Sequence, residues 1–458
     1  MPPATSPAPD SPPARGGLLK VLGVAFGVAI IVGNTIGAGI LRTPGDVAAL
    51  LPSAGLFLGV WIAGGIYAFF GAMTMAELAV MIPRSGGNYV FARRAFGEYP
   101  GFVIGYTDWI STCAAAAAVS IAIGELTGQL VPAMGDMTTV VALVVSLVLV
   151  GVHWIGVRSG DRTQQVLSLF KTVALLGVAA ACFFVTPVGG AVATAAAATP
   201  TVSLPVGMAF TTALVISFQS VAYTYDGWNG VVYFGGEVRD PGREIPRAMA
   251  LGVVAIMAVY LALNSAFLYV LGIEQLGQQT FAAAGAANVV FGPTGERVVS
   301  VVMILSMLGA VSAIIMQGSR VPFALAEDGL MPRVFTTVNK GGTPTLSLLL
   351  SFGIIIALVV SGTFATVVAL AAFFYVMQYG VNFLAIFVLR RTEPDTPRAY
   401  RAWGYPYVTG LLLAAAVAFL VGSFVTDRAN TVNSLYVLVA SYPIYLITRR
   451  LVRRRRDS

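Results

Sequence analysis

Apolar segments of about twenty residues, each long enough to cross the ~30 Å hydrocarbon core of a bilayer, recur along the whole chain. Of its 458 residues, 57% are hydrophobic and only 10% are charged, whereas about a quarter are charged in soluble globular domains. The segments predict an all-α integral membrane protein with about twelve transmembrane helices. The expected spans are 20–49, 53–82, 95–131, 138–156, 163–187, 204–236, 246–272, 293–328, 345–361, 364–390, 406–425 and 430–448.

The first span is interrupted near its centre. The stretch from Gly33 to Gly39, GNTIGAG, places glycines and polar residues where a simple spanning helix would hold Leu, Ile or Val. Glycine destabilises a helix by about 1 kcal/mol relative to alanine. Backbone groups freed in lipid cost several kcal/mol each unless they find partners. A helix broken at this depth is therefore expected only where it lines a cavity or holds a ligand.

A second interruption, YTYDGWNG from Tyr223 to Gly230, follows about five spans later. Two interrupted helices at corresponding places in two halves of a membrane chain indicate an inverted repeat with a binding site between the breaks. We expect repeat one over about 20–187 and repeat two over about 204–391. Helices 11 and 12, over about 406–448, fall outside the repeat.

Together these segments predict one transporter domain over 20–448. The segment 1–19 before it is rich in Pro, Ala and Ser and is expected to be disordered. The segment 449–458 is expected to be a basic tail.

Basic residues are divided unequally between the two sides of the predicted topology. Of the 27 lysines and arginines, only Arg42, Arg297 and Arg428 fall on the second side, and Lys171 falls within a span. Because lysine and arginine concentrate in cytoplasmic loops, both termini are predicted to be cytoplasmic in a multi-pass protein of the cell (plasma or inner) membrane. This topology accounts for the net charge of +7, so no nucleic-acid partner is expected.

The two breaks offer opposite charges to a ligand. The exposed N–H end of a half-helix carries about half a positive charge and the exposed carbonyl end about half a negative one. We expect the N–H groups of Ala38 and Gly39 to hold a carboxylate, so that a side chain at Gly39 would block it. Carbonyls of Thr35, Tyr223 and Asp226 are expected to hold an ammonium. The predicted substrate-binding residues are Thr35, Ile36, Gly37, Ala38, Gly39, Tyr223, Tyr225, Asp226 and Gly227.

A second interpretation of the first break stays open. Gly33 and Gly37 are four residues apart, and small residues at this spacing pack helices against one another in lipid. Neither interpretation calls for a cofactor or a metal ion, and none is expected.

Several motifs, in order along the chain, resemble one family of transporters. The stretch from Val32 to Leu41 is similar to the first-helix signature of the amino acid–polyamine–organocation (APC) superfamily. Glu77-Leu78 followed by PRSGGNY from Pro83 is similar to its signature between the second and third helices. Tyr223 to Trp228 resembles the sixth helix of the L-type amino acid transporter branch. Further similar segments are EVRDP from Glu237, IPRA from Ile245, and Ser319 to Pro332.

The resemblance, over about residues 20–400, implies a LeuT-like 5+5 inverted repeat with broken helices 1 and 6, and amino acid transport. The chain departs from the family at Ala38, where many relatives carry a serine. The loop from Val131 to Met137 also lacks the cysteine that glycoprotein-linked animal members carry there. No disulfide-linked heavy-chain subunit is therefore expected.

Lys171 lies about 13 Å into the fifth span, counted from Arg162 at 1.5 Å per residue. An intramembrane lysine costs at least about 2.5–3.5 kcal/mol and is a functional hypothesis by default. The resemblance implies that its ammonium replaces the sodium ion of related transporters, with Ser312 and Gln317 as expected neighbours. The alternative is a lysine that snorkels to the cytoplasmic surface.

Other ionisable residues in spans have plainer interpretations. Asp226 is either a gating or proton-linked carboxylate or a partner for freed backbone N–H groups. Asp108 and Glu125 are expected to pair or to lie near interfaces. His153, the only histidine, is expected to be structural.

The sequence thus predicts a sodium-independent transporter that exchanges neutral L-amino acids by alternating access, with a small amino acid and the lipid bilayer as its partners. A proton-coupled amino acid symporter is the alternative, because a buried lysine can titrate. An integral-membrane enzyme would need a catalytic cluster, whereas the acids here are scattered. A channel would need a ring of repeated polar residues, which the sequence does not contain.

Overall fold

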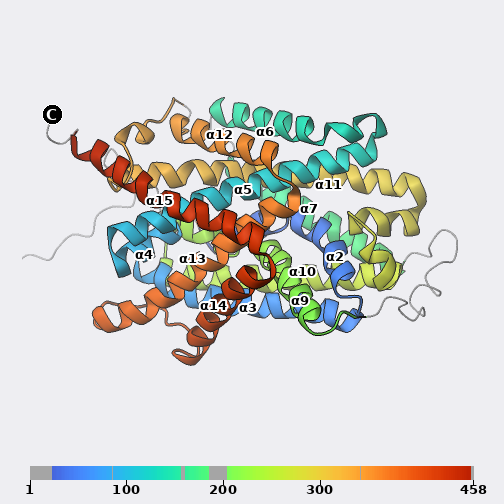
Figure 1. Cartoon of the computed structure of the whole chain (residues 1–458), viewed down its shortest axis with the longest axis horizontal. Helices are drawn as coiled ribbons and strands as arrows, with labels where there is room; N and C mark the ends of the chain where they lie inside the picture. The colour runs from blue at the N-terminus through green and yellow to red at the C-terminus, as the bar shows by residue number, and fades with distance from the viewer. Residues whose placement is uncertain (1–22, 85, 156–159, 185–203, 341, 455–458) are drawn as a thin grey trace, which may run out of the picture.

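The computed structural model describes residues 23–84, 86–155, 160–184, 204–340 and 342–454, and these form a bundle of helices (Figure 1). The segment 1–19, predicted to be disordered, lies outside the described residues. The α-helices are α1 Val24–Thr35, α2 Ala38–Leu50, α3 Ala54–Met81, α4 Asn88–Phe96, α5 Glu98–Leu130, α6 Thr138–Ile155, α7 Gly160–Phe184, α9 Met208–Tyr225, α10 Pro241–Gly277, α11 Ala282–Glu327, α12 Thr345–Ser361, α13 Phe364–Thr392, α14 Tyr407–Thr426 and α15 Arg428–Arg454. Short 3₁₀ helices are η1 Pro132–Met137, η2 Gly230–Tyr233, η3 Gly235–Glu237 and η4 Arg333–Thr336.

A helix lies within each of the predicted spans, and the all-α membrane fold class is confirmed. In the described part, eight single helices are long and apolar enough to cross a membrane, and α1 with α2 form a ninth span bent by 47°. The apolar part of α7 and the whole of α12 are shorter than this criterion requires. The count of about twelve therefore stays a prediction. α15 continues to Arg454, into the segment predicted to be a basic tail.

The central helix of the bundle is α5, which Figure 1 shows between α6 and α12 on one side and α13 on the other. It packs against α11, α13, α6, α4 and α12. The alanines from Ala114 to Ala118 are buried, and such small side chains let helices approach closely in lipid. The Trp109 indole donates to Ser351 Oγ on α12 at 2.8 Å. α5 thus joins α11 and α13, on which it packs most extensively, at the centre of the bundle.

Two glycines turn the chain back over one end of the bundle. Gly272 and Gly292 have φ values of +67° and +72°, in a region that L side chains rarely adopt. The predicted spans end at residue 272 and begin again at residue 293, so the sequence places both turns correctly. The segment between them lies against α2, because a Cβ added at Gly45 would be 1.9 Å from the carbonyl oxygen of Gln279. This segment therefore covers the second half of the interrupted first span.

Glu77, near the end of α3, joins three segments at the opposite end of the bundle. Its side chain is only 2% exposed. It accepts two hydrogen bonds from the Arg390 guanidinium on α13, at 2.9 and 2.7 Å, and one from the backbone N–H of Ala402 at 2.7 Å. Arg398 lies 3.3 Å away. A forked arginine with further donors is the arrangement that offsets the desolvation of a buried carboxylate.

We expect Glu77→Gln to lower the free energy of unfolding by about 3–5 kcal/mol, because it leaves two arginines without their counter-charge. The measurement is the midpoint of thermal unfolding in detergent. The matched control is Arg94→Gln, which breaks the ion pair with Glu393 but changes a side chain that is 54% exposed, and should cost no more than about 1 kcal/mol. Equal shifts for both variants would contradict this account of the buried cluster.

Candidate functional site

The first helix breaks where the sequence predicts. α1 ends at Thr35 and α2 begins at Ala38, with Ile36 and Gly37 between them in non-helical conformations. The last carbonyls of α1 therefore lack their usual helical partners, and the first N–H groups of α2 have no side-chain cap. Both sets of backbone groups are left available at the middle of the bundle.

The second break lies directly against the first. α9 ends at Tyr225, and Gly227 then adopts φ +106°. A Cβ at Gly227 would be 2.7 Å from Thr35 Oγ1 and 3.0 Å from Asn34 Cβ. Both the conformation and the close approach require glycine at this position. Gly227 is thus the contact that brings the two breaks together.

Lys171 satisfies two of the freed carbonyls of the first break. Its Nζ donates to Gly33 O at 2.6 Å and to Ile36 O at 2.7 Å, and the residue is 3% exposed. A lysine that snorkels would reach the surface, so that alternative does not match the geometry. The expected neighbours were wrong: Ser312 Oγ lies 3.0 Å from His153 Nε2, and Gln317 accepts from Asn34. Each of these side chains is thus bonded to a residue other than Lys171.

Tyr260 on α10 satisfies carbonyls of both breaks at once. Its hydroxyl lies 2.7 Å from Thr35 O and 2.9 Å from Thr224 O, and the residue is fully buried. A hydroxyl has a single proton, so it donates to one of these carbonyls at a time. Tyr260 was not among the predicted site residues, because a tyrosine in a membrane span more often packs against neighbours than takes part in a site.

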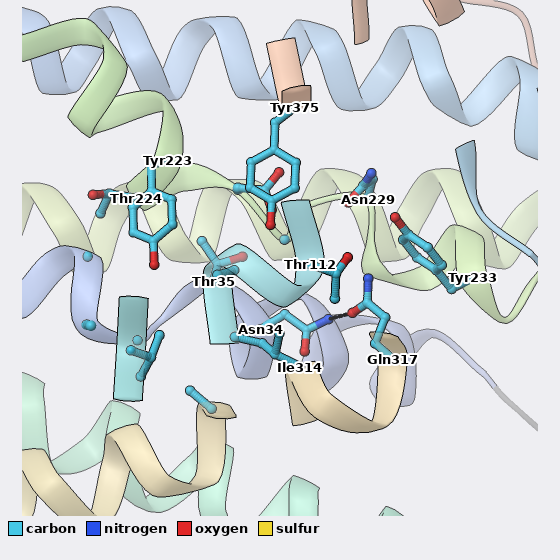
Figure 2. A pocket seen from close by; sticks show the side chains of 18 residues that line it. Asn34, Thr35, Thr112, Tyr223, Thr224, Asn229, Tyr233, Ile314, Gln317 and Tyr375 are labelled. Atoms are coloured by element: carbon cyan, nitrogen blue, oxygen red, sulfur yellow. Dashed lines mark hydrogen bonds between the residues drawn. The ribbon is translucent and has the colours of Figure 1, made fainter. Parts of the chain in front are cut away.

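A cavity of about 50 Å³ lies between the two breaks (Figure 2). One water molecule needs about 10–15 Å³ of such volume, so the cavity is small and its walls lie close together. Its lining residues are Asn34, Thr35, Gly37, Ala38, Gly39, Thr112, Ala115, Val119, Tyr223, Thr224, Asp226, Gly227, Asn229, Tyr233, Ala310, Ile314, Gln317 and Tyr375. Figure 2 shows the hydrogen bond, 3.2 Å long, that the Asn34 amide donates to Gln317 across this space.

Seven of the nine residues predicted to bind substrate line this cavity: Thr35, Gly37, Ala38, Gly39, Tyr223, Asp226 and Gly227. Ile36 and Tyr225 do not. Ile36 is fully buried and contributes its carbonyl to Lys171. The Tyr225 ring packs on Trp61 and Tyr260, behind the break.

Among the described residues that line the cavity, Asp226 is the only aspartate, glutamate, lysine, arginine or histidine. Its carboxylate accepts a hydrogen bond from the Tyr379 hydroxyl on α13. This bond ties the second break to α13. The two alternative roles predicted for Asp226 stay predictions.

Aromatic and charged side chains close the site on one side. The Tyr223 ring packs edge-on against Phe364, with ring centres 6.4 Å apart, and the Arg42 guanidinium lies 4.2 Å from the Phe364 ring centre. Arg42 also pairs with Glu125 on α5 and Asp46, both at 2.8 Å. The expectation that Glu125 is paired is thus confirmed, and this side of the site is covered.

The opposite side is open through a vestibule of about 730 Å³. Tyr233 and Gln317 line both this vestibule and the smaller cavity, so the two spaces meet at these side chains. Arg84, Arg320 and Glu327 line the vestibule, on the side that the charge pattern assigns to the cytoplasm. The vestibule thus opens on the side that the charge pattern predicts to be cytoplasmic. Among the described residues, no cluster of His, Cys, Asp and Glu could hold a metal ion.

Gly39 also packs against α9. It lines the cavity, but the position of an added Cβ is taken: a Cβ there would lie 2.8 Å from Thr224 Oγ1 and 2.9 Å from Thr224 Cα. At Gly37, by contrast, a Cβ would meet only Ala310 Cβ at 3.6 Å, and φ is −142°. Gly39 is thus a packing contact between α2 and α9.

We therefore expect Gly39→Ala to destabilise the protein by about 1–3 kcal/mol, the usual cost of overpacking. Gly37→Ala is its matched control and should change stability by less than about 1 kcal/mol, since glycine-to-alanine changes without strain are mildly stabilising. Thermal unfolding of both variants is the measurement. If Gly39→Ala were as stable as Gly37→Ala, the contact with Thr224 would not be as close as described.

Tyr260→Phe is expected to lower the free energy of unfolding by about 1–3 kcal/mol, because it leaves a buried carbonyl without a donor. Tyr67→Phe is a suitable control, since the Tyr67 hydroxyl is buried without a hydrogen-bond partner and its loss should be neutral or stabilising. The measurement is the midpoint of thermal unfolding of both variants. A neutral Tyr260→Phe would show that its hydroxyl does not hold the two breaks.

The chain is similar to known proteins over almost its whole length. A sequence profile of the family described as "Amino acid permease" matches residues 18–447. The serine/threonine exchanger SteT of Bacillus subtilis (strain 168) is 27% identical over 440 residues, which cover 94% of this chain and 97% of that protein.

Mammalian transporters are similar to about the same degree. The large neutral amino acids transporter small subunit 2 of Mus musculus is 28% identical, over 97% of this chain and 84% of that protein. The b(0,+)-type amino acid transporter 1 of Mus musculus is also 28% identical, over 83% of this chain and 78% of that protein. The chain therefore belongs to the amino acid permease family of the APC superfamily, in which it resembles the L-type branch, and it is an amino acid transporter of the membrane rather than an enzyme.

Proposed function

We propose that this protein exchanges neutral amino acids across the cell membrane without sodium, by alternating access to the cavity between its two interrupted helices. The observation that carries this proposal is the position of Lys171, whose ammonium donates to Gly33 O and Ile36 O at 2.6 and 2.7 Å. The fixed positive charge of the ammonium, placed beside these carbonyls, stabilises them as a bound cation would. A sodium ion and the ammonium cannot occupy the same space, so coupling to sodium at this position is not expected.

The backbone around the cavity suits a zwitterion. The N–H groups at the start of α2 have no side-chain cap and carry the positive end of the helix dipole, so they are a binding site for a carboxylate. Thr35 O and Tyr223 O each already accept one hydrogen bond. A carbonyl oxygen has two lone pairs, so each can still accept from the substrate ammonium.

The lining supports a neutral side chain. The described residues of the lining include no lysine or arginine, and the carboxylate of Asp226 already accepts a hydrogen bond from Tyr379. A charged substrate side chain would therefore enter a narrow space without a free counter-charge, at a high desolvation cost. Two of the relatives are named for neutral substrates, serine and threonine in one case and large neutral amino acids in the other.

We propose that the protein lies in the plasma or inner membrane with both termini in the cytoplasm. The loops on the side of the termini carry nearly all of the basic residues, as cytoplasmic loops do. We also propose that the chain works without a disulfide-linked heavy chain. Both of its cysteines, Cys113 and Cys182, are buried, and the loop that contains η1 has none.

The test is exchange in proteoliposomes in which choline replaces sodium. We expect the wild type to take up labelled amino acid only when unlabelled amino acid is inside, and to do so at the same rate with or without sodium. Lys171→Ala should lose about tenfold or more of this rate, because hydrogen bonds to a charged group contribute about 1.5–3 kcal/mol each and 1.4 kcal/mol corresponds to tenfold. Lys340→Ala, which removes an exposed lysine, is the matched control.

Three results would contradict the proposal. Uptake that collapses in choline would show sodium coupling. Uptake into empty vesicles driven by a pH gradient would favour the proton-coupled symporter. Unimpaired exchange by Lys171→Ala would show that the ammonium is not needed.

A further inference from the structure

Asp108 on α5 is a second buried acid that amino acid recognition does not use. It is fully buried. Within the described part of the chain, no lysine, arginine or histidine forms an ion pair with it. An isolated carboxylate in such surroundings is costly, and an intramembrane acid is a functional hypothesis by default. Of the two alternatives expected for Asp108, pairing or a place near an interface, the described residues show no ion pair, and the hydrogen-bond partner of its carboxyl is the neutral Tyr233.

The groups that face Asp108 can form hydrogen bonds with its carboxyl in both the protonated and the ionised state. The Tyr233 hydroxyl on η2 lies 2.7 and 2.9 Å from the two carboxyl oxygens of Asp108 and donates its single proton to one of them at a time. The Gln378 amide on α13 lies 3.2 Å from Asp108 Oδ1, and the Asn88 amide on α4 donates to the Tyr233 hydroxyl at 3.4 Å. In the orientation that satisfies both of its ends, the Gln378 amide donates to Asp108 Oδ1 and accepts from the Asp108 backbone N–H at 2.9 Å. The Tyr233 hydroxyl can donate to a carboxylate or, once turned, accept from a carboxylic acid, so Asp108 has a partner in either form.

Other titratable groups nearby oppose a negative charge. Asp226, across the candidate site, acts on Asp108 as a like charge. Tyr375 on α13 is the remaining titratable group that interacts with the carboxyl, and it is neutral unless deprotonated. No positive charge in the described chain compensates these two acids directly, so one proton on the pair lowers its energy.

Tyr233 connects this acid to water. Its side chain lines both the small cavity and the open vestibule, while its hydroxyl is bonded to Asp108 (Figure 2 shows it beside Gln317). For a proton to leave the Asp108 carboxyl, the Tyr233 hydroxyl must first turn its own O–H toward vestibule water. The Tyr233 oxygen then accepts the carboxyl proton as the hydroxyl gives its original proton to the water. The products are a carboxylate and a hydrated proton, and Tyr233 is unchanged.

We propose that Asp108 is a proton-binding site, occupied in this conformation and in exchange with the inner vestibule through Tyr233. Tyr233 lies between the candidate site and the vestibule. Loss of the proton from Asp108 changes the hydrogen bond that holds the Tyr233 side chain, past which substrate reaches the inner side. Amino acid exchange is therefore controlled by the pH on the inner side. This site is independent of whether the transporter exchanges substrates or couples them to another ion.

The direct test is infrared spectroscopy of the purified protein in lipid, in the region where protonated carboxylic acids absorb. We expect wild type at neutral pH to show a band from a buried carboxylic acid, and Asp108→Asn to lack it. The same band must remain in Asp226→Asn, which controls for the other acid. Tyr233→Phe should shift the band, because it removes the hydroxyl that donates to the carboxyl, and this variant keeps the test decisive if Asp108→Asn does not fold.

A second readout uses proteoliposomes with the inner pH varied. Wild-type exchange should depend on inner pH, and Asp108→Asn, which imitates the neutral form, should lose that dependence. The proposal is overturned if the band persists in Asp108→Asn, if it does not shift in Tyr233→Phe, or if Asp108→Asn keeps the wild-type pH profile. Because the infrared band requires no substrate, failure of this inference can be distinguished from failure of the proposed exchange.

Discussion

Breaking a helix inside a bilayer leaves backbone carbonyls and N–H groups without partners and without water to replace them. This protein breaks two helices and packs the breaks against each other at Gly227. The carbonyls of the first break are then satisfied from two directions, by the Lys171 ammonium and by the Tyr260 hydroxyl. The N–H groups at the start of α2 have no side-chain cap, and an anionic group can accept hydrogen bonds from them. The site is thus defined by which freed groups the protein satisfies itself and which it leaves for a ligand.

The same contacts explain how such a site can be opened alternately. On the covered side, Arg42 on α2 reaches across to Glu125 on α5, and the segment after Gly272 packs on α2. The ion pair must break before α2 can move away from α5 there. On the open side, the Asn34 amide joins α1 to α11 through its hydrogen bond to Gln317.

Local sequence carried enough information to find the breaks but not their partners. Glycines and polar residues in the middle of an apolar span are visible in a single stretch, so Gly33 to Gly39, Asp226 and Lys171 were all predictable. Which carbonyl a distant hydroxyl meets depends on packing between helices that are far apart in the chain. For this reason Tyr260 was missed, Ser312 and Gln317 were assigned to the wrong neighbour, and Tyr225 was placed in the cavity instead of behind it. Gly39 was recognised as special, and the close approach that the structure shows there is made by Thr224.

The central claim is that the backbone of the two breaks recognises both charged ends of an amino acid. The most direct test is competition binding to the purified protein in sodium-free buffer, in which a neutral amino acid is compared with its methyl ester and its N-acetyl derivative. Each derivative keeps the side chain but removes one charge, so the account predicts that neither competes effectively with the parent amino acid. Equal competition by either derivative would mean that the half-helix ends do not bind the zwitterion, and the account would be wrong.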